Sequence, residues 1–382
     1  MLKRHKIIWS ILRPFVIIFL YIKFGYTFKT AKNLPSNFIL LSNHNTDFDP
    51  IFVGVSFRQN IRFVASEHIS RWKHAFKFLD YAFAPIMRSK GTNAASTVKE
   101  MLKTTRAGYN IGLFAEGARS WNGVTAPILP STGKVVKSSK CALVTYKITG
   151  GYFVSPMWSS GGTRKGKIHG EIVNVYTKEQ IAEMSVDEIN EIIRRDLHED
   201  AYETQKTLKA KYKGKQIAVE MESMLYACPQ CNDIDTLFSS DNVVMCRSCH
   251  NHFFYNEYGD IEGLDQSNIK ELFLWLKEKA EADAKANVKY ESLDANLITV
   301  ENHIETPISS GTVSLDKDSL VCGDYSINIC DIEDCAMHGR YSLVFSTKDT
   351  YYEMTIPQQY STLKFYMLFQ AHKYGSVNKF NF

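Results

Sequence analysis

Short apolar runs alternate with longer amphipathic stretches through the first half of the chain, and this alternation restricts the fold more than any other feature. The predicted strands are residues 38–42, 62–65, 84–87, 111–114, 142–148 and 168–175. Helices are predicted between them at residues 50–55, 75–81 and 94–107. Strands that alternate with helices favour an α/β domain, with a mixed, largely parallel sheet flanked by helices.

Charge is distributed unevenly along the chain. Residues 1–175 carry 25 Lys and Arg against 7 Asp and Glu, a balance of +18, whereas the remainder carries 20 against 34, a balance of −14. A basic first half indicates an anionic partner: a phospholipid surface, a phosphorylated substrate or a nucleic acid.

The 382 residues are too many for one ordinary domain of roughly 150 residues, so several segments are expected. After about residue 298 the pattern alternates with period 2 and ends in a helix near 361–373, a profile typical of a small barrel or a pleckstrin-homology-like module. The predicted segments are a membrane-helix region at 1–30, the α/β domain with its closing helices at 31–222, a cysteine-rich segment at 224–262, a connector helix at 269–288 and a β-rich domain at 298–382.

The N-terminus begins with Lys3, Arg4 and Lys6 and then becomes apolar. Its longest uncharged run, residues 14–22, is nine residues long, whereas a helix that crosses a bilayer needs roughly 20. We therefore expect a helix that lies in the membrane interface, with basic residues against lipid head groups. A terminal helix packed on the core of its own domain is the alternative.

Four cysteines form two C-x-x-C pairs separated by fourteen residues: Cys228, Cys231, Cys246 and Cys249. This spacing is typical of a zinc ribbon, and four sulfur ligands leave no open position, so the predicted zinc is structural. Reduced thiols favour a cytoplasmic location. The surroundings are acidic, so a nucleic-acid partner is not expected despite the ribbon.

His44 directly follows the predicted strand 38–42, and Asp49-Pro50 has the form of a helix start with Asp49 as the N-cap. A tight turn brings the Asp49 carboxylate back onto the His44 imidazole, which gives a general base with an orienting partner. Taken alone, a histidine with an aspartate five positions later is more often a turn residue and a helix cap.

Two further strand ends carry charged residues. Glu116, Gly117 and Arg119 follow one predicted strand, and Arg88 ends another. A guanidinium group can donate two parallel hydrogen bonds to two oxygens of one phosphate. These positions therefore suit an acceptor that bears both a phosphate and a hydroxyl group.

Together these residues resemble the glycerolipid acyltransferase family, which includes the 1-acylglycerol-3-phosphate acyltransferases. Residues 43–50 are similar to the family's first motif, and Arg88 stands where its second motif has an arginine. Residues 114–120 resemble the third motif, with alanines where the family usually has proline and threonine. Residues 143–146 stand at the place of the family's fourth motif but lack the proline that is common there. The resemblance covers about residues 10–175.

The resemblance implies transfer of a fatty acyl group from acyl-CoA or acyl carrier protein to a lysophospholipid hydroxyl, as in conversion of 1-acylglycerol-3-phosphate to phosphatidic acid. Residues 31–222 would be the acyltransferase domain, on the cytoplasmic face of the cell membrane as a peripheral or monotopic protein. The implied roles are general base for His44, orienter for Asp49, phosphate binding for Arg88 and Arg119, and acceptor-pocket lining for Glu116 and Gly117. The alternatives are a catalytically silent lipid-binding or scaffolding protein on the same fold, and a zinc-ribbon nucleic-acid binder.

Overall fold

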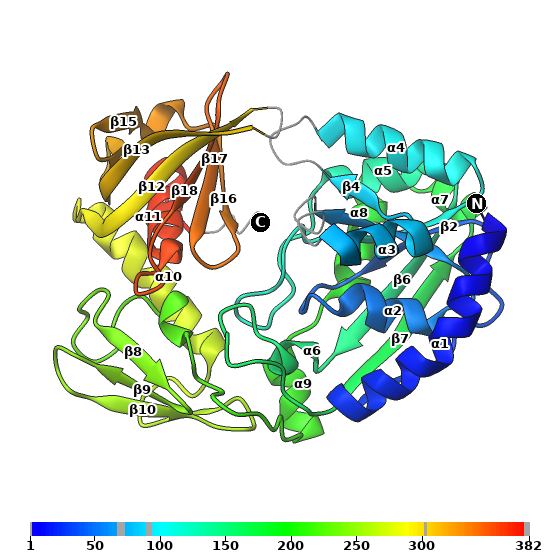
Figure 1. Ribbon diagram of the computed structural model, residues 1–382, viewed down its shortest axis with the longest axis horizontal. Coiled ribbons are helices and arrows are strands. Elements are labelled where there is room, and N and C mark those ends of the chain that lie inside the picture. The colour runs from blue at the N-terminus through cyan, green and yellow to red at the C-terminus, as the bar shows by residue number, and fades with distance from the viewer. Residues whose placement is uncertain (1, 67–72, 89–93, 302–303, 378–382) are drawn as a thin grey trace. The chain divides into compact units, whose positions relative to one another are not determined.

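A computed structural model describes residues 2–66, 73–88, 94–301 and 304–377 (Figure 1). The chain divides into two compact units. The first comprises residues 1–155 and 165–212, and the second comprises residues 156–164 and 213–382. The predicted segments 1–30, 31–222 and 298–382 each include a few residues outside the described ranges.

The described part of the first unit contains a seven-stranded sheet in the order β1-β7-β6-β2-β5-β3-β4. Its strands are β1 Tyr26–Phe28, β2 Phe38–Ser42, β3 Ile61–Ser66, β4 Ile86–Arg88, β5 Asn110–Phe114, β6 Ala142–Thr149 and β7 Ile168–Tyr176. Neighbouring strands are parallel except β6 and β7, which are antiparallel. The predicted mixed, largely parallel sheet is thus confirmed.

Helices cover both faces of this sheet (Figure 1). They are α1 Leu2–Phe24, α2 Asp49–Ser56, α3 Lys73–Phe83, α4 Ala94–Arg106, α5 Ser131–Ser139, α6 Gly151–Val154, α7 Lys178–Glu183, α8 Val186–Leu197 and α9 Ala201–Leu208. Ile39 and Leu41 of β2 share one buried cluster with Ile189 and Ile193 of α8. The intervening Phe38 points to the opposite face, because side chains alternate along a strand, and its ring lies 5.9 Å from that of Phe57 just after α2.

A buried carboxylate fixes α8 to strands β6 and β7 of the sheet. Asp196 accepts hydrogen bonds from Thr145 Oγ1 of β6 (2.8 Å), and from Asn174 Nδ2 (3.0 Å) and Tyr176 OH (2.8 Å) of β7. Burial alone would raise the pKa of the Asp196 carboxyl, but these bonds and Arg195 hold it below its usual value. The antiparallel β6–β7 pair is therefore held against α8 by polar as well as apolar contacts.

The described part of the second unit contains two antiparallel sheets. The smaller sheet, in the order β11-β10-β9-β8, consists of β8 Leu237–Ser240, β9 Val243–Cys246, β10 His252–Tyr255 and β11 Ile261–Glu262. The larger consists of β12 Tyr290–Glu301, β13 Ile304–Leu315, β14 Ser319–Cys322, β15 Tyr325–Asn328, β16 Asp334–His338, β17 Ser342–Ser346 and β18 Tyr351–Thr355. Two helices, α10 Ile269–Lys285 and α11 Thr362–Tyr374, and two short 3-10 turns, Met221–Ser223 and Ile329–Asp331, complete the unit.

The larger sheet consists of two meanders, β12–β15 and β16–β18, which are joined by the pairing of β12 with β18. Its strand order is β15-β14-β13-β12-β18-β17-β16, and α11 packs on it with ten of its residues buried. The predicted β-rich C-terminal region with a terminal helix is confirmed. Its likeness to pleckstrin-homology modules stays a prediction.

Candidate active site

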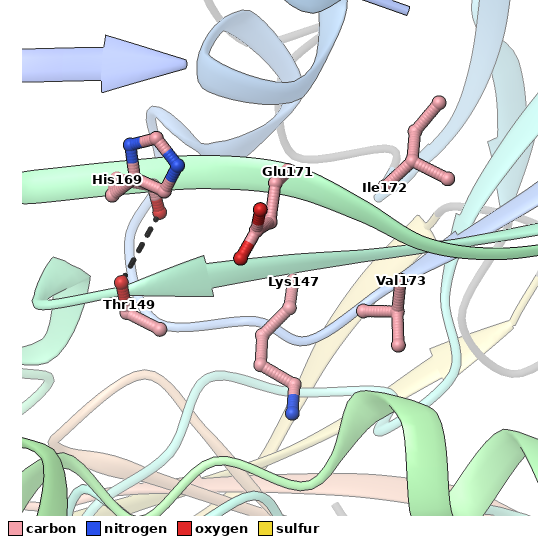
Figure 2. Close-up of a pocket in the computed structure, with 6 residues that line it drawn as sticks. All are labelled: Lys147, Thr149, His169, Glu171, Ile172 and Val173. Atoms are coloured by element: carbon pink, nitrogen blue, oxygen red, sulfur yellow. Dashed lines mark hydrogen bonds between the residues drawn. The ribbon is translucent and has the colours of Figure 1, made fainter. Parts of the chain in front are cut away.

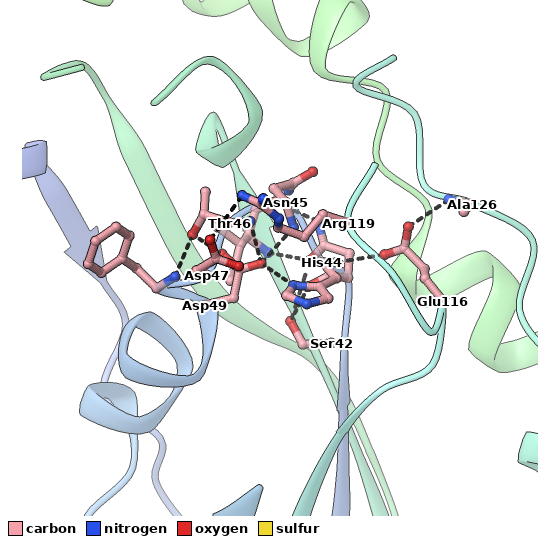
Figure 3. A network of polar contacts seen from close by, with 12 residues as sticks. Ser42, His44, Asn45, Thr46, Asp47, Asp49, Glu116, Arg119 and Ala126 are labelled. Atoms are coloured by element: carbon pink, nitrogen blue, oxygen red, sulfur yellow. Dashed lines mark hydrogen bonds and ion pairs between the residues drawn. The ribbon is translucent and has the colours of Figure 1, made fainter. Parts of the chain in front are cut away.

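The candidate site lies where two neighbouring parallel strands end. Ser42, the last residue of β2, is paired with Phe114, the last residue of β5. His44 and Glu116 each follow their strand by two residues. The two loops therefore leave the sheet side by side, and Figure 3 shows their side chains in one polar network.

The His44 imidazole contacts the Asp49 carboxylate, as predicted, with 2.8 Å between Nδ1 and Oδ2. Asp49 is fully buried and also accepts hydrogen bonds from the backbone N–H groups of Asn45 (2.6 Å) and Thr46 (2.9 Å) and from Thr46 Oγ1 (2.7 Å). A carboxylate surrounded by donors acts as an acceptor. His44 Nδ1 is therefore the donor of this bond, and in the neutral ring the lone pair lies on Nε2.

Asp49 is not the N-cap of α2, contrary to the prediction from the sequence. The N-cap of α2 is Phe48, without a side-chain cap, rather than Asp49. Asp49 is already the first helical residue, and its carboxylate turns back to the loop before the helix. Its bonds go to His44, Asn45 and Thr46 instead of to α2.

An aromatic stack fixes the plane of the His44 ring. The ring lies 4.4 Å from that of Phe114 with an interplanar angle of 24°, and Phe63 stacks on Phe114 in turn at 5.8 Å. The His44 side chain keeps 20% of its surface exposed. The imidazole is thus fixed by a carboxylate and an aromatic face, with part of it open to a substrate.

Glu116 holds the backbone of residues 43–49, the turn that carries the predicted catalytic pair and is called the catalytic turn below. Its Oε1 accepts from the N–H of His44 and its Oε2 from the N–H of Ala126, both at 2.6 Å, while the N–H of Ser120 donates to the carbonyl of His44 at 3.0 Å. Burial raises the pKa of Glu116 to about 8, and the two backbone bonds oppose that shift. Gly117, with φ of +79°, forms the turn that brings Glu116 inward.

Arg119 contacts Asp47 of the catalytic turn, with 3.3 Å between NH1 and Oδ2. Asp47 was not among the predicted site residues, because a lone aspartate in a loop gives no signal of its own. The predicted residues His44, Asp49, Glu116, Gly117 and Arg119 therefore meet at the ends of β2 and β5.

Arg88 stands apart from this network. It is exposed at the end of β4, at the same edge of the sheet but three strands from β2. That separation is about 14 Å at roughly 4.8 Å per strand. Only an extended ligand could contact Arg88 and His44 together.

A separate hollow of about 320 Å³ lies on β6 and β7, lined by Lys147, Thr149, His169, Glu171, Ile172 and Val173 (Figure 2). Two of its polar side chains have partners within the protein: Glu171 pairs with Lys29, and His169 Nδ1 lies 2.9 Å from Thr27 Oγ1. The histidine of this hollow contacts a hydroxyl, whereas His44 beside β2 contacts a buried carboxylate.

The four predicted cysteine ligands converge in the second unit. Their Sγ atoms all lie within 4.8 Å of one another, with 3.8 Å between Cys228 and Cys249 and 3.7 Å between Cys231 and Cys246. Four sulfurs about 2.3 Å from a tetrahedral ion stand about 3.8 Å apart. The cluster therefore fits a metal ion.

Part of the chain matches a known protein family. Residues 25–149 match the acyltransferase family model, and they include His44, Asp49, Arg88, Glu116 and Arg119. No curated protein matches the chain. Among solved structures, the chain is similar to the 1-acyl-sn-glycerophosphate (LPA) acyltransferase PlsC from Thermotoga maritima, with 18% identity and a TM-score of 0.41 over 51% of this chain and 78% of that one.

Proposed function

We propose that the chain, whose residues 25–149 match the acyltransferase family model, transfers a fatty acyl group from acyl-CoA or acyl carrier protein to a lysophospholipid hydroxyl. The acceptor we favour is 1-acylglycerol-3-phosphate. The observation that carries this proposal is the His44–Asp49 pair, in which Nδ1 lies 2.8 Å from the Oδ2 atom of a fully buried carboxylate.

In the proposed reaction, His44 Nε2 takes the proton of the acceptor hydroxyl as its oxygen attacks the carbonyl carbon of the thioester. The tetrahedral intermediate then expels the thiolate, and the His44 imidazolium returns the proton to the sulfur. The products are an ester and a free thiol. Asp49 stabilises the imidazolium between the two steps and keeps the ring in its tautomer.

Arg119 is the group we propose for the acceptor phosphate, since it lies beside the catalytic turn. Arg88, farther along the same edge, suits a second anionic group of an extended substrate. Glu116 has both oxygens bonded to backbone, so we assign it to holding the turn in place. Gly117 shapes the loop that carries Arg119.

The direct test is an acyl-transfer assay with the purified full-length protein in mixed micelles. Acyl-CoA and acyl carrier protein thioesters would each be offered with several lysophospholipids, and free thiol would be measured alongside diacyl product. We expect both to form in equal amounts with a phosphate-bearing acceptor. Lysophospholipid binding without turnover of any pair would instead support the silent scaffold.

We also propose that α1 holds the protein on an anionic membrane surface. Among the described residues, one helical segment, Arg4–Phe24, is long and apolar enough to cross a membrane. Yet the α1 side chains Trp9 and Phe24 are buried within the first unit, and Arg13 Nε donates to the carbonyl of Val55 at 2.7 Å. These contacts support a helix that lies on its domain and meets lipid along its outer face.

That outer face is apolar at helical spacing. Its exposed side chains are Ile7, Ile11, Phe15, Ile18 and Ile22. Replacing Ile11, Phe15 and Ile18 together with serine is expected to lower binding to anionic vesicles at least about tenfold, because apolar burial drives interfacial association. Cosedimentation of the protein with anionic vesicles measures this loss of binding.

The matched control is Leu274→Ser, since Leu274 is an exposed apolar residue of α10 in the second unit. It should leave vesicle binding unchanged. Equal losses in the two variants, or no loss in the triple variant, would contradict the proposed role of α1. Reduced cysteines in the ribbon favour the cytoplasmic face of the membrane.

For the four-cysteine cluster, we propose a structural zinc ion held by Cys228, Cys231, Cys246 and Cys249. Zinc accepts four thiolates tetrahedrally, and no ligand position is left for a substrate. When bound, the ion would cross-link the turn before β8 to the turn after β9.

A further inference from the structure

The ion pair between Asp47 and Arg119 joins two residues that differ in exposure. The Asp47 side chain keeps 71% of its surface exposed, whereas the Arg119 side chain keeps 17%. Arg119 is thus held within the loops, and one of its nitrogens faces a carboxylate on the outer side of the catalytic turn (Figure 3).

The other two carboxylates of this site have structural partners. Both are buried: Asp49 accepts from the backbone N–H groups of Asn45 and Thr46, and Glu116 accepts from those of His44 and Ala126. Asp47, in contrast, is an exposed side chain at the tip of the turn, two residues before Asp49. An exposed ion pair contributes only about 0–1 kcal/mol, so a stronger anion can displace it.

We propose that Asp47 occupies the place of the acceptor's phosphate on Arg119 and so sets the enzyme's affinity for anionic acceptors and products. This inference rests on the proposed function. A phosphate monoester carries between one and two negative charges near neutral pH and offers three oxygens, so it competes well with a single carboxylate for a guanidinium. When the phosphate binds, the Asp47 carboxylate stays nearby and repels it.

Such competition has a use in the reaction cycle. Acyl transfer changes the hydroxyl end of the acceptor and leaves its phosphate intact. An arginine without a competing carboxylate would hold product as tightly as substrate through that phosphate. Return of Asp47 to Arg119 gives the product's phosphate a competitor and favours its release.

The test is Asp47→Asn, which keeps the shape of the side chain and removes its charge. We expect the KM for 1-acylglycerol-3-phosphate to fall about threefold to tenfold, the size expected for one partly screened charge. Inhibition by phosphatidic acid should strengthen by a similar factor. The KM for a monoacylglycerol, which has no phosphate, should stay the same.

Two controls separate this effect from a general change in charge. Asp187→Asn removes an exposed carboxylate from the first turn of α8, and it should leave the KM unchanged even though it makes the protein equally more basic. In an Arg119→Gln background, Asp47→Asn should no longer lower the KM, because the group for which Asp47 competes is gone.

The outcomes distinguish the two proposals. If the wild-type protein esterifies no phosphate-bearing acceptor, the proposed function fails and this inference fails with it. If the wild type is active and Asp47→Asn leaves the KM unchanged or raises it, only the role of Asp47 is overturned. An equal fall in KM with Asp187→Asn, or one that persists with Arg119→Gln, would also overturn it.

Discussion

Replacing His44 with alanine is expected to lower kcat about 10²-fold to 10⁴-fold while the protein stays folded. The loss has that size because a positioned general base contributes about this factor. The fold should survive, since the ring is partly exposed and its contacts are the Asp49 carboxylate and the face of Phe114. Release of free thiol from the acyl donor, followed with circular dichroism on the same sample, measures both effects.

The matched control is His169→Ala, which removes the same kind of side chain from the hollow on β6 and β7 (Figure 2). Because His169 contacts Thr27 rather than the catalytic turn, this variant should keep its turnover. If His44→Ala retained wild-type kcat, the proposed proton transfer would be wrong. If both variants lost activity equally, the loss would report damage to the sheet.

Asp49→Asn should impair turnover as well, but for two reasons that have to be separated. An amide cannot accept as many hydrogen bonds as the carboxylate, so the imidazolium loses its partner and the N–H groups of Asn45 and Thr46 lose theirs. This variant is therefore expected to melt at a lower temperature than His44→Ala, and His44→Ala is the cleaner test of chemistry.

The first half of the fold could be predicted because its signals are local. The apolar runs that end at Ser42 and Phe114 are long enough to identify buried strands, and the structure ends both strands at those residues. In contrast, β1 is a three-residue strand with a single buried side chain, and α5 is rich in serine and lysine. Both form through tertiary contacts, and neither was predicted.

The C-terminal strands were only partly predicted for a similar reason. In β12 a register shift between Ser292 and Ala295 interrupts the two-residue alternation, so its pattern does not identify a strand. The same alternation predicts one strand over residues 325–332, but β15 ends at Asn328 and Ile329–Asp331 form a 3-10 turn.

In the candidate site too, only the contact between residues close in sequence was predictable. His44 and Asp49 lie five residues apart, so a local turn suffices to bring them together and the sequence pointed to their contact. The bonds of Glu116 to His44 and Ala126, and the pair of Arg119 with Asp47, depend on how two loops from different strands meet. The spacing of these residues along the chain does not predict how the two loops pack together.

Removing the metal from the four-cysteine cluster is expected to lower the melting temperature of the second unit by at least about 10 °C. Residues 224–262 carry four short strands, and a segment of that size has too little core to fold without a staple. Structural zinc contributes on the order of 10 kcal/mol to small domains of this kind. Calorimetry before and after dialysis against a chelator, with zinc measured by mass spectrometry, gives the result.

Removal of the metal should destabilise the β-rich module as well as the ribbon, because a buried ion pair connects the two. Lys364 of α11 is fully buried, pairs with Asp235 between the two cysteine pairs, and donates to the carbonyl of Glu291 on β12 at 2.5 Å. If the ribbon unfolds, Lys364 loses its carboxylate while still inside the module. Leaving a buried charge unpaired costs about 3–5 kcal/mol.

This coupling predicts that Cys246→Ser and chelation destabilise the whole second unit in a single transition. The control is Cys330→Ser, the same substitution at an exposed cysteine outside the cluster, which should change neither zinc content nor melting temperature. A metal-free protein with unchanged stability would argue against the structural zinc. If only the ribbon lost structure while α11 kept its protection from hydrogen exchange, the zinc assignment would stand and the coupling through Lys364 would be wrong.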